Sequence, residues 1–575
     1  MKKGLKMVAF LLSMVFVVSS LSACGESNAT NDNTSNSADR YDNTSGTMET
    51  ANSSDNTDSN DNGNERTVTL TAWVPDNIRI EDWNTNAMTL WLEEQTGYDL
   101  EMIPLSSEDY ITKVNMALTA GSTDDLPDII FSEGFSDTAV WSWAETGSII
   151  SLTDYYNNPE LAVNINEAIE RTGVDYTQQI LSPDGNIYGI ATYNQSYGNE
   201  FSSKIWIYQP WLEALGKDVP TTTEEFYEIL KLVSETDLNG NGKKDEIGML
   251  GSTGLYVKYW QVLMNAFSYA GDTQYRAVKD GKVSVAYTTD EWKNGLKYLK
   301  RLFDEGLIAA ESLTISDEQF KTLINSENPT VFSFSHTAVD MVEAGTSRQT
   351  DYIYIDTLTG PDGVNYSSYT PSVAYISMII TANCSNPEAA FRIGDLMSSE
   401  YIGITQRWGE EGIDWDYAEK VKNISDYTAS VEGFDLSIVA YSDSTFWGGT
   451  DVTNHCWRQI GPFVRQYGIA NGVGIIADET DKYTQQLNAA NSLYQNAGHK
   501  PAEVIPKLIY TTEEAESIAE IESVLNTYVE ESMASFVTGS KDIDADWNNY
   551  LTEIENIGLS QYLEVVQTAY DRMYK

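Results

Sequence analysis

Apolar and polar positions alternate with two different periods along the first part of the chain. The pattern predicts three strands and two helices in alternation, over residues 67–74, 86–96, 98–103, 109–119 and 126–131. The first of these, TVTLTAWV, has the period of two that a half-buried strand shows. The first helix should end at Gly97, because glycine commonly terminates helices. Strand, helix, strand, helix, strand is the order of a parallel α/β sheet.

The same kinds of element recur in the middle of the chain. Further strands are predicted over residues 204–208, 331–334, 352–355 and 372–381, and helices over residues 223–234 and 291–305. After about Ser385 the pattern predicts mainly helix. About 500 residues follow Thr67, which is more than one hydrophobic core holds, so we predict two or more lobes.

The start of the chain has the layout of an exported and anchored protein. Three lysines precede an apolar run over residues 7–18, which is too short to span a bilayer and is typical of a signal peptide. Leu-Ser-Ala-Cys at residues 21–24 then resembles the lipobox of bacterial lipoproteins. We therefore expect residues 1–23 to be removed and Cys24 to carry a diacylglyceryl group with fatty acids such as palmitate. The alternative is an ordinary signal peptide with an incidental cysteine.

A long polar segment follows the cysteine. Residues 25–66 are almost entirely Asn, Ser, Thr, Asp and Gly, with Tyr41 and Met48 as the only large apolar side chains. Such a segment buries too little surface to offset the entropy of ordering. We expect residues 24–66 to be a lipidated cysteine and a disordered tether, with a root-mean-square reach of about 35 Å.

The charge of the chain excludes several classes of function. Lys and Arg number 35 against 86 Asp and Glu, a net charge of -51. This argues against a nucleic-acid partner and against a polybasic membrane-binding patch, since both need concentrated positive charge.

The motifs of common hydrolases are missing from the sequence. The chain has three histidines and no HExxH, CxxC or GxSxG motif, so zinc and serine hydrolases lack their usual residues. Cys384 and Cys456 are interpreted as two buried thiols rather than a disulfide.

Five sequence stretches together resemble one protein family. They are LPDIIF, KIWIYQPWLEALGKDVPTTTEEFYEIL, NPEAAFRIGDLMSSE, RWGEEGIDW and DIDADWNNYLTEIENIGLSQYLEVVQTAYDRMY. In this order and spacing they resemble extracellular solute-binding proteins of the carbohydrate class, family 1 type. The last two are similar to the large lipoprotein branch found in Gram-positive bacteria, whose members are the substrate-binding proteins of ABC importers. The resemblance extends over essentially the whole mature chain.

The resemblance implies an α/β protein with a two-lobed periplasmic-binding-protein-like fold, a hinge and an interlobe ligand cleft. The chain should cross between the lobes near residues 193–203, 369–374 and 441–457. We expect a first lobe of residues 67–195 plus 374–445 and a second lobe of residues 196–373 plus 446–575.

The resemblance also implies a function, which is capture of oligosaccharides outside the cell and delivery to an importer, without catalysis. The expected partners are an oligosaccharide, two ABC permease subunits and, through them, a cytoplasmic ATPase. We expect a monomer on the extracellular face of the cell membrane, held by its lipid anchor only. Two alternatives stay open: a membrane-tethered glycoside hydrolase, which needs two facing carboxylates, and a binding protein for peptides or other solutes. A calcium-dependent adhesin is disfavoured because the chain shows no repeats.

Aromatic and polar residues near predicted strand ends and crossings are candidates for sugar contact. Sugar rings stack on Trp and Tyr, and sugar hydroxyls bind planar polar groups. The candidates are Trp73, Asp76, Trp141, Tyr193, Asn194, Trp260, Trp408, Glu411, Trp447 and Asn454. The alternative for each aromatic residue is a place in the hydrophobic core.

One loop has the composition of a calcium site. Oxygen ligands at alternate positions suit calcium, and glycine at the sixth position allows a sharp bend. The expected ligands of a structural Ca²⁺ are Asp237, Asn239, Asn241, Lys243 through its carbonyl, Asp245 and Glu246. Position twelve of an EF-hand, normally a bidentate Glu, would be Gly248, so Glu246 has to supply that carboxylate, as in the alginate-binding members that the chain resembles. The alternative is a polar turn without metal.

Overall fold

The computed structural model describes most of the chain beyond the N-terminal segment. The described residues are 68–120, 126–196, 200–201, 203–254, 259–270, 274–336, 341–343, 346–430, 433–441, 452–476, 489–490, 492–494 and 499–575. They belong to one compact unit, Asn64–Lys575. The predicted signal peptide, Cys24 and the predicted tether lie outside the described residues.

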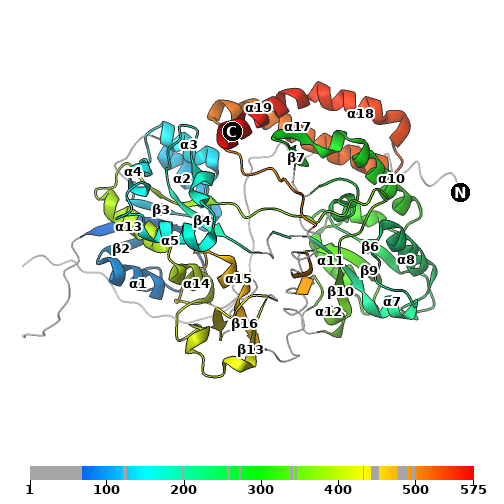
Figure 1. The fold of residues 1–575 in the computed structure, drawn as a ribbon, viewed down its shortest axis with the longest axis horizontal. Coiled ribbons are helices and arrows are strands. Elements are labelled where there is room, and N and C mark those ends of the chain that lie inside the picture. Colours follow the sequence, from blue (N-terminus) through cyan, green and yellow to red (C-terminus); the bar gives the residue numbers. More distant parts are fainter. Residues whose placement is uncertain are drawn as a thin grey trace, which may run out of the picture. The chain divides into compact units, whose positions relative to one another are not determined.

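The first sheet has six strands in the order β15-β4-β11-β3-β1-β2 (Figure 1). Its strands are β1 (Thr69–Pro75), β2 (Asp99–Leu105), β3 (Ile129–Phe131), β4 (Ile190–Asn194), β11 (Tyr375–Ile380) and β15 (Val464–Arg465). Strand β1 runs parallel to β2 and β3, which confirms the parallel arrangement predicted for this part. Strand β11 is antiparallel to both β3 and β4, so the complete sheet is mixed.

Helices cover both faces of the first sheet. They are α1 (Ala87–Thr96), α2 (Tyr110–Thr119), α3 (Asp137–Glu145), α4 (Thr153–Tyr156), α5 (Val163–Thr172), α13 (Pro387–Met397) and α14 (Glu400–Trp408). Helices α1 and α13 share one hydrophobic core with the sheet, whereas α2 and α3 share another. Helix α1 begins where the Asn86 side chain accepts a hydrogen bond from Met88 N, and it ends at Gly97 in a left-handed conformation with φ of 73°. The predicted end of this helix is therefore confirmed.

The second sheet has four strands in the order β10-β5-β9-β6. They are β5 (Lys204–Tyr208), β6 (Ile247–Leu250), β9 (Val331–His336) and β10 (Tyr352–Ile355), and a separate hairpin joins β7 (Arg276–Lys279) to β8 (Lys282–Val285). The helices of this part are α7 (Gln209–Ala214), α8 (Thr223–Glu235), α9 (Tyr259–Met264), α10 (Asp290–Asp304), α11 (Asp317–Ile324) and α12 (Ser347–Asp351). The predicted strands 204–208 and 352–355 match β5 and β10.

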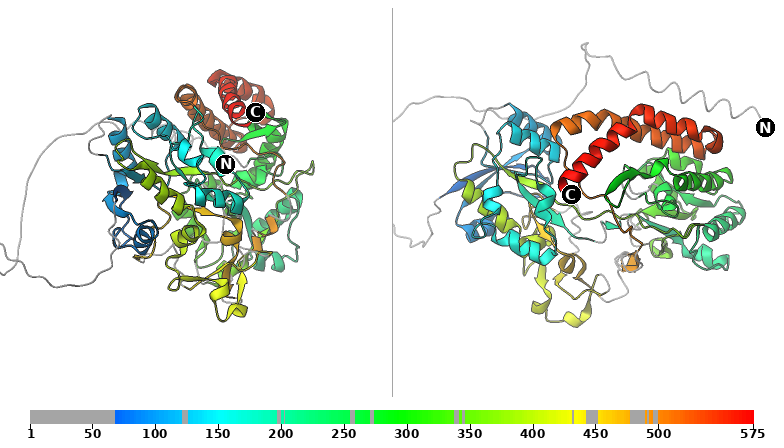
Figure 2. Two further views of the ribbon diagram at one scale, coloured as in Figure 1. Left: turned by 60° about the vertical axis from the view of Figure 1, so that its left-hand side comes forward. Right: turned by 45° about the horizontal axis from the view of Figure 1, so that its top comes forward.

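Three C-terminal helices complete the core of the second sheet. They are α17 (Thr512–Val537), α18 (Ile543–Ile557) and α19 (Leu559–Tyr574). They pack against one another, as the orange and red ribbons of Figure 2 show, and α17 also packs on α10. Their buried residues, among them Trp547 and Tyr562, belong to the same hydrophobic core as β5 and β9.

A third, small sheet corrects the prediction of mainly helix after about Ser385. It contains β12 (Trp415–Tyr417), β13 (Tyr427–Ala429), β14 (Ile438–Ala440) and β16 (Val473–Ile476), with α15 (Tyr467–Asn471) beside it. Strands of three or four residues are too short to show a clear alternation, which explains why the pattern missed them. Single turns of 3-10 helix lie at Ser107–Asp109, Tyr176–Ile180, Ala286–Thr288, Ala310–Leu313, Ala418–Lys420 and Ile424–Asp426.

The chain passes between the two large sheets in the regions where crossings were expected. It leaves the first sheet after β4 and enters the second at β5, and it returns between β10 and β11. Later in the chain, Trp457, Ile460 and Phe463 pack in a core of the first sheet, and β15 pairs with β4. These contacts join residues far apart in the sequence, so they have no local signal.

Candidate functional site

Polar side chains gather where two neighbouring strands of the first sheet end. Strands β4 and β15 run in parallel, and Asn194 is the register partner of Arg465. After Asn194 the chain leaves for the second sheet. Ligands of open α/β sheets bind at the carboxyl ends of such strands, where connections diverge. We call Asn194, Arg407, Trp408, Arg465 and Gln466 the strand-end cluster.

Arg465 is the centre of this cluster. Its side chain is only 2% exposed. Its Nε donates to the Gly403 carbonyl oxygen at 2.8 Å, and its Nη1 lies 3.4 Å from Gln459 Oε1. Its Nη2 is buried and has no hydrogen-bond partner among the described residues. A buried guanidinium nitrogen without a partner is costly, so its retention points to a role other than packing.

Helix α14 carries the aromatic part of the cluster to Arg465. The Arg465 guanidinium carbon lies 4.9 Å from the centroid of the Trp408 ring and 4.8 Å from that of Phe463. The close approach of α14 depends on Gly403, because a β-carbon there would overlap the Val464 carbonyl oxygen. Trp408 is half-buried, and it packs against the small core that contains Ile404 and Trp415. The helix thus offers an indole ring beside a guanidinium group.

Two further polar atoms of the cluster have no partner. Asn194 Oδ1 and Gln466 Oε1 are both buried without a hydrogen bond among the described residues. The Gln466 Nε2 donates to Glu400, which holds the amide in place. The cluster therefore has a free donor at Arg465 and free acceptors at Asn194 and Gln466. Hydrogen-bonding groups of both kinds beside an aromatic ring are what sugar hydroxyls require.

The cluster contains two buried guanidinium groups, and the Glu400 carboxylate lies beside Gln466. Burial lowers the pKa of Arg407 to about 10. Burial also lowers the pKa of Arg465, and the nearby charge of Arg407 lowers it further. Within the described part of the chain, no carboxylate forms an ion pair with Arg465. This is unusual for a protein with a net charge of -51.

Of the ten predicted sugar contacts, Asn194 and Trp408 come together at the strand-end cluster. Trp73, Asp76 and Trp141 lie elsewhere on the first lobe. Trp73 packs against the core at the end of β1, and Asp76 is exposed just beyond it. Trp141 lies on α3 with its ring edge toward Tyr188, and its buried Nε1 has no hydrogen-bond partner among the described residues.

Two other predicted contacts have structural tasks inside the first lobe. Tyr193 is 3% exposed, and its ring stacks on Tyr176 with centroids 5.3 Å apart. The Asn454 side chain accepts from Asp82 N and donates to the Thr85 carbonyl oxygen, so it holds the loop before α1. These contacts argue against a role for either side chain in ligand binding.

The remaining predicted contacts lie apart from the cluster or outside the described residues. Glu411 forms an ion pair with Lys420. Trp260 lies on α9 and donates to Tyr275 Oη at 3.4 Å in the second lobe. Trp447 lies outside the described residues. The sequence pattern does not single out Arg465, because its place in the cluster depends on the pairing of β15 with β4.

The predicted calcium loop is a tight, hydrogen-bonded turn. Asp237 Oδ2 accepts from Gly242 N at 2.9 Å, and Asn241 Nδ2 donates to both carboxylate oxygens of Asp245. Hydrogen bonds from Asn239 and Asn241 lower the pKa of Asp245. Gly242 has a φ of 83°, which the bend requires. The loop therefore turns several of its oxygen-bearing side chains toward one another.

Glu246 is the buried member of this loop. Its Oε1 accepts from Leu238 N at 2.7 Å and from Asn239 N at 3.0 Å. Its Oε2 is buried and has no partner among the described residues. No cluster of three or more His, Cys, Asp or Glu residues occurs within the described ranges, so a metal here would depend also on amide and carbonyl oxygens. An unpaired buried carboxylate oxygen fits a hard cation such as Ca²⁺.

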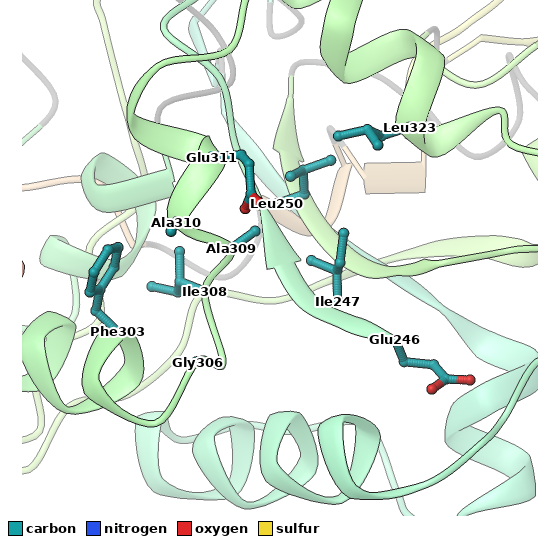
Figure 3. Close-up of a pocket in the computed structure, with 10 residues that line it drawn as sticks. All are labelled: Glu246, Ile247, Leu250, Phe303, Gly306, Ile308, Ala309, Ala310, Glu311 and Leu323. Atoms are coloured by element: carbon teal, nitrogen blue, oxygen red, sulfur yellow. The ribbon is translucent and has the colours of Figure 1, made fainter. Parts of the chain in front are cut away.

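A cavity of about 370 Å³ adjoins this loop in the second lobe (Figure 3). It is lined by Glu246, Ile247, Leu250, Phe303, Gly306, Ile308, Ala309, Ala310, Glu311 and Leu323. Most of these side chains are aliphatic, and Figure 3 shows Glu246 and Glu311 well separated. Sugar binding needs several convergent polar groups, so this cavity fits that ligand less well than the strand-end cluster does.

The two cysteines of the described region are free thiols. Cys456 is buried and Cys384 is half-buried. Burial raises the pKa of each thiol to about 12, which makes both unreactive at neutral pH. The expected burial is found for Cys456, whereas Cys384 is only half-buried.

A match to a family model assigns the chain to a class. Residues 69–400 match the model of bacterial extracellular solute-binding proteins. The chain belongs to this family, and the two-lobed fold predicted from the sequence is that of its structural relatives. Within the described ranges, none of the helices combines the length and apolar character needed to cross a bilayer.

Individual relatives resemble the chain over most of its length. FusA of Streptococcus pneumoniae serotype 4, a fructooligosaccharide ABC transporter substrate-binding protein, is 25% identical over 86% of this chain and 88% of its own. A solute-binding protein of Bifidobacterium longum infantis associated with an HMO-binding ABC transporter superposes with a TM-score of 0.71 at 20% identity, over 88% of this chain and 99% of the other. An EF-hand mutant of FusA in complex with fructo-nystose superposes with a TM-score of 0.64 at 23% identity, with the same coverage.

Proposed function

We propose that this protein is the substrate-binding lipoprotein of an ABC importer and that it captures oligosaccharides between its two lobes. The strand-end cluster carries the proposal, because it combines a half-buried aromatic ring at Trp408 with unpaired polar atoms at Asn194 and Arg465. The resemblance to FusA over most of both chains supports the ligand class. The permease subunits and the ATPase behind them are then the partners.

The mechanism is capture at equilibrium. A ligand that binds the closed arrangement of the lobes better than the open one shifts the population toward the closed form. The closed form then docks on the permease. The groups without partners in the cluster are a guanidinium nitrogen and two amide oxygens, which bind a sugar but do not transfer protons. This favours a binding protein over a glycoside hydrolase, which needs two carboxylates across one bond.

We also propose that Cys24 carries a lipid and that the loop 237–246 binds a structural Ca²⁺. Family membership supports a position outside the cell, which a lipid anchor would maintain at the membrane. For calcium, the support is the unpaired Oε2 of Glu246, the convergent loop oxygens and the EF-hand of the FusA variant. Asp237, Asn241, Asp245 and Glu246 would hold the ion with side-chain oxygens, and Lys243 would contribute its carbonyl.

A thermal-shift panel tests the proposed ligand class. The purified protein is heated with fructooligosaccharides, plant and host oligosaccharides, acidic oligosaccharides and short peptides. A bound ligand at 100 times its Kd stabilises the folded state by about 2.7 kcal/mol, so at least one glycan should raise the Tm by several degrees. A shift with peptides but with no glycan would refute oligosaccharide binding and leave the transport role in place.

A further inference from the structure

We propose that the ligand of the strand-end cluster carries a carboxylate and that Arg465 binds it. The solute is then an acidic oligosaccharide, such as one that contains uronic acid residues. This inference rests on the proposed function and names the chemical class of its substrate. It is independent of the neutral fructooligosaccharides that FusA binds.

The first argument is the balance of charge. Arg465 is 2% exposed, and among the described residues it has no ion-pair partner. Buried charges in proteins are normally paired, because removal from water is costly. The chain contains 86 acidic residues, yet none of those that the structure describes forms an ion pair with Arg465. A negatively charged ligand would supply the missing partner.

The second argument is the geometry of the guanidinium group. Its Nε is held by the Gly403 carbonyl oxygen, whereas Nη1 has one long contact of 3.4 Å and Nη2 has none. The end that carries Nη1 and Nη2 is therefore the less well paired end of the group, and a ligand would have to reach it from the buried side. Two parallel N–H donors at this end match the two oxygens of a carboxylate. A neutral sugar hydroxyl would occupy only one of them.

The third argument is a second cation beside the first. The charge of Arg407 contributes to the lowered pKa of Arg465, so the two guanidinium groups act on each other. A charge near Arg465 of the same sign makes the Arg465 guanidinium harder to accommodate without an anion. Trp408 lies beside both groups, with its ring centroid 5.3 Å from the Arg407 guanidinium carbon. The ring can stack on the sugar whose carboxylate Arg465 binds.

The fourth argument is the backbone next to the cluster. Arg458 and Gln459 are consecutive non-glycine residues with positive φ, 51° and 66°. Such conformations are strained and persist where surrounding contacts enforce them, often at functional sites. Here Gln459 N donates to Gln406 Oε1 at 2.9 Å, and the Gln459 side chain is placed toward Arg465. This backbone conformation places the Gln459 side-chain oxygen beside Arg465 Nη1.

The test compares matched ligands on the unmodified protein. Trigalacturonate and triguluronate are each titrated by calorimetry beside their carboxyl-reduced counterparts, which differ only in lacking the carboxylates, and beside kestose. We expect at least one acidic trisaccharide to bind roughly 10- to 100-fold more tightly than its reduced counterpart, the usual effect of charge-assisted hydrogen bonds. Equal affinities, or binding of neutral sugars alone, would overturn the acidic ligand and leave oligosaccharide capture intact. Binding of no glycan, either here or in the thermal-shift panel, would overturn oligosaccharide binding and with it this inference, and would leave the transport role in place.

A variant assigns the effect to Arg465. Arg465→Lys keeps the charge but loses the paired donors, so it should weaken acidic ligands roughly tenfold and change neutral ones little. The control is Arg301→Lys on α10, whose guanidinium pairs with Glu224 away from the cluster. An Arg465→Lys protein that keeps the wild-type preference for the acidic trisaccharide would contradict the assignment. If this variant does not fold, the matched wild-type ligands still decide the inference.

Discussion

A lysine with no exposed surface lies where the chain passes from the first sheet to the second. Lys204 opens β5, and its Nζ donates to the Phe201 carbonyl oxygen at 2.6 Å and lies 5.9 Å from the centroid of the Tyr494 ring. Burial lowers the pKa of Lys204 from its ordinary value of 10.5 to about 7. A charge that is costly to bury therefore lies beside one of the segments expected to bend.

The lowered pKa makes the stability of the protein depend on pH. Between about pH 7 and 10.5 the unfolded chain binds this proton more tightly than the folded one does, so stability rises with pH in that window. Below it, both states are protonated and the contribution of Lys204 is constant. The expected slope is at most about 1.4 kcal/mol per pH unit. Urea unfolding at a series of pH values measures it.

Replacing the lysine separates its contribution from that of other groups. Lys204→Met should be more stable than the wild type at pH 7 and should lack the rise toward higher pH. Lys321→Met is the matched control, because the Lys321 side chain is 45% exposed and its loss should not change the slope. A slope that survives in Lys204→Met would show that another group is responsible.

At the scale of single elements, the loop between α8 and β6 is where we expect a bound ion to affect stability. It is entered from a helix with a capping box at Thr222 and Glu225, and it leads directly into a buried strand. Glu246 closes the loop by accepting two backbone N–H groups at its start. An ion bound here would join the ends of α8 and β6, which share the core of the second lobe.

Calcium removal should therefore lower stability without weakening ligand binding. EDTA should lower the Tm by several degrees, since an ion at 100 times its Kd contributes about 2.7 kcal/mol. Asp237→Ala should abolish this sensitivity and leave ligand affinity nearly unchanged. Asp304→Ala, which removes a carboxylate that pairs with Lys300 on the surface, is the control and should still respond to EDTA. A Tm that ignores both EDTA and added calcium would refute the site.

At the scale of the whole molecule, the described hydrophobic cores and the proposed lipid anchor belong to different parts of the chain. The cores contain residues from both large sheets and the C-terminal helices, and Leu70 is the first of the described residues in them. We therefore expect a change at Cys24 to alter attachment to the membrane and to leave the packing of these cores unchanged.

Cys24→Ala should release the protein into the medium with its Tm and ligand affinity unchanged. One acyl chain gives only marginal binding to a membrane, whereas the two of a diacylglyceryl cysteine give stable attachment. Fractionation of cells and medium measures the effect. Cys384→Ala is the matched control and should stay with the membrane. Finding the Cys24→Ala protein still bound to cells would contradict the lipid anchor.

The sequence alone determined the features that depend on neighbours along the chain. The C-terminal end of α1 followed from Gly97, and strands β5 and β10 followed from short apolar runs, because capping and burial patterns are local. The order of five weak motifs determined the family and with it the two-lobed fold. The polar composition of the calcium loop was likewise visible without any structure.

Tertiary structure alone decided which of the candidate residues meet. Tyr193 and Asn454 lay in the right segments, yet one is taken up by the core and the other by the loop before α1. Arg465 stood out only when β15 was placed beside β4, since its register with Asn194 joins residues 271 positions apart. Pairing between distant strands depends on the packing of the whole lobe, so no local pattern of hydrophobic and polar positions specifies it.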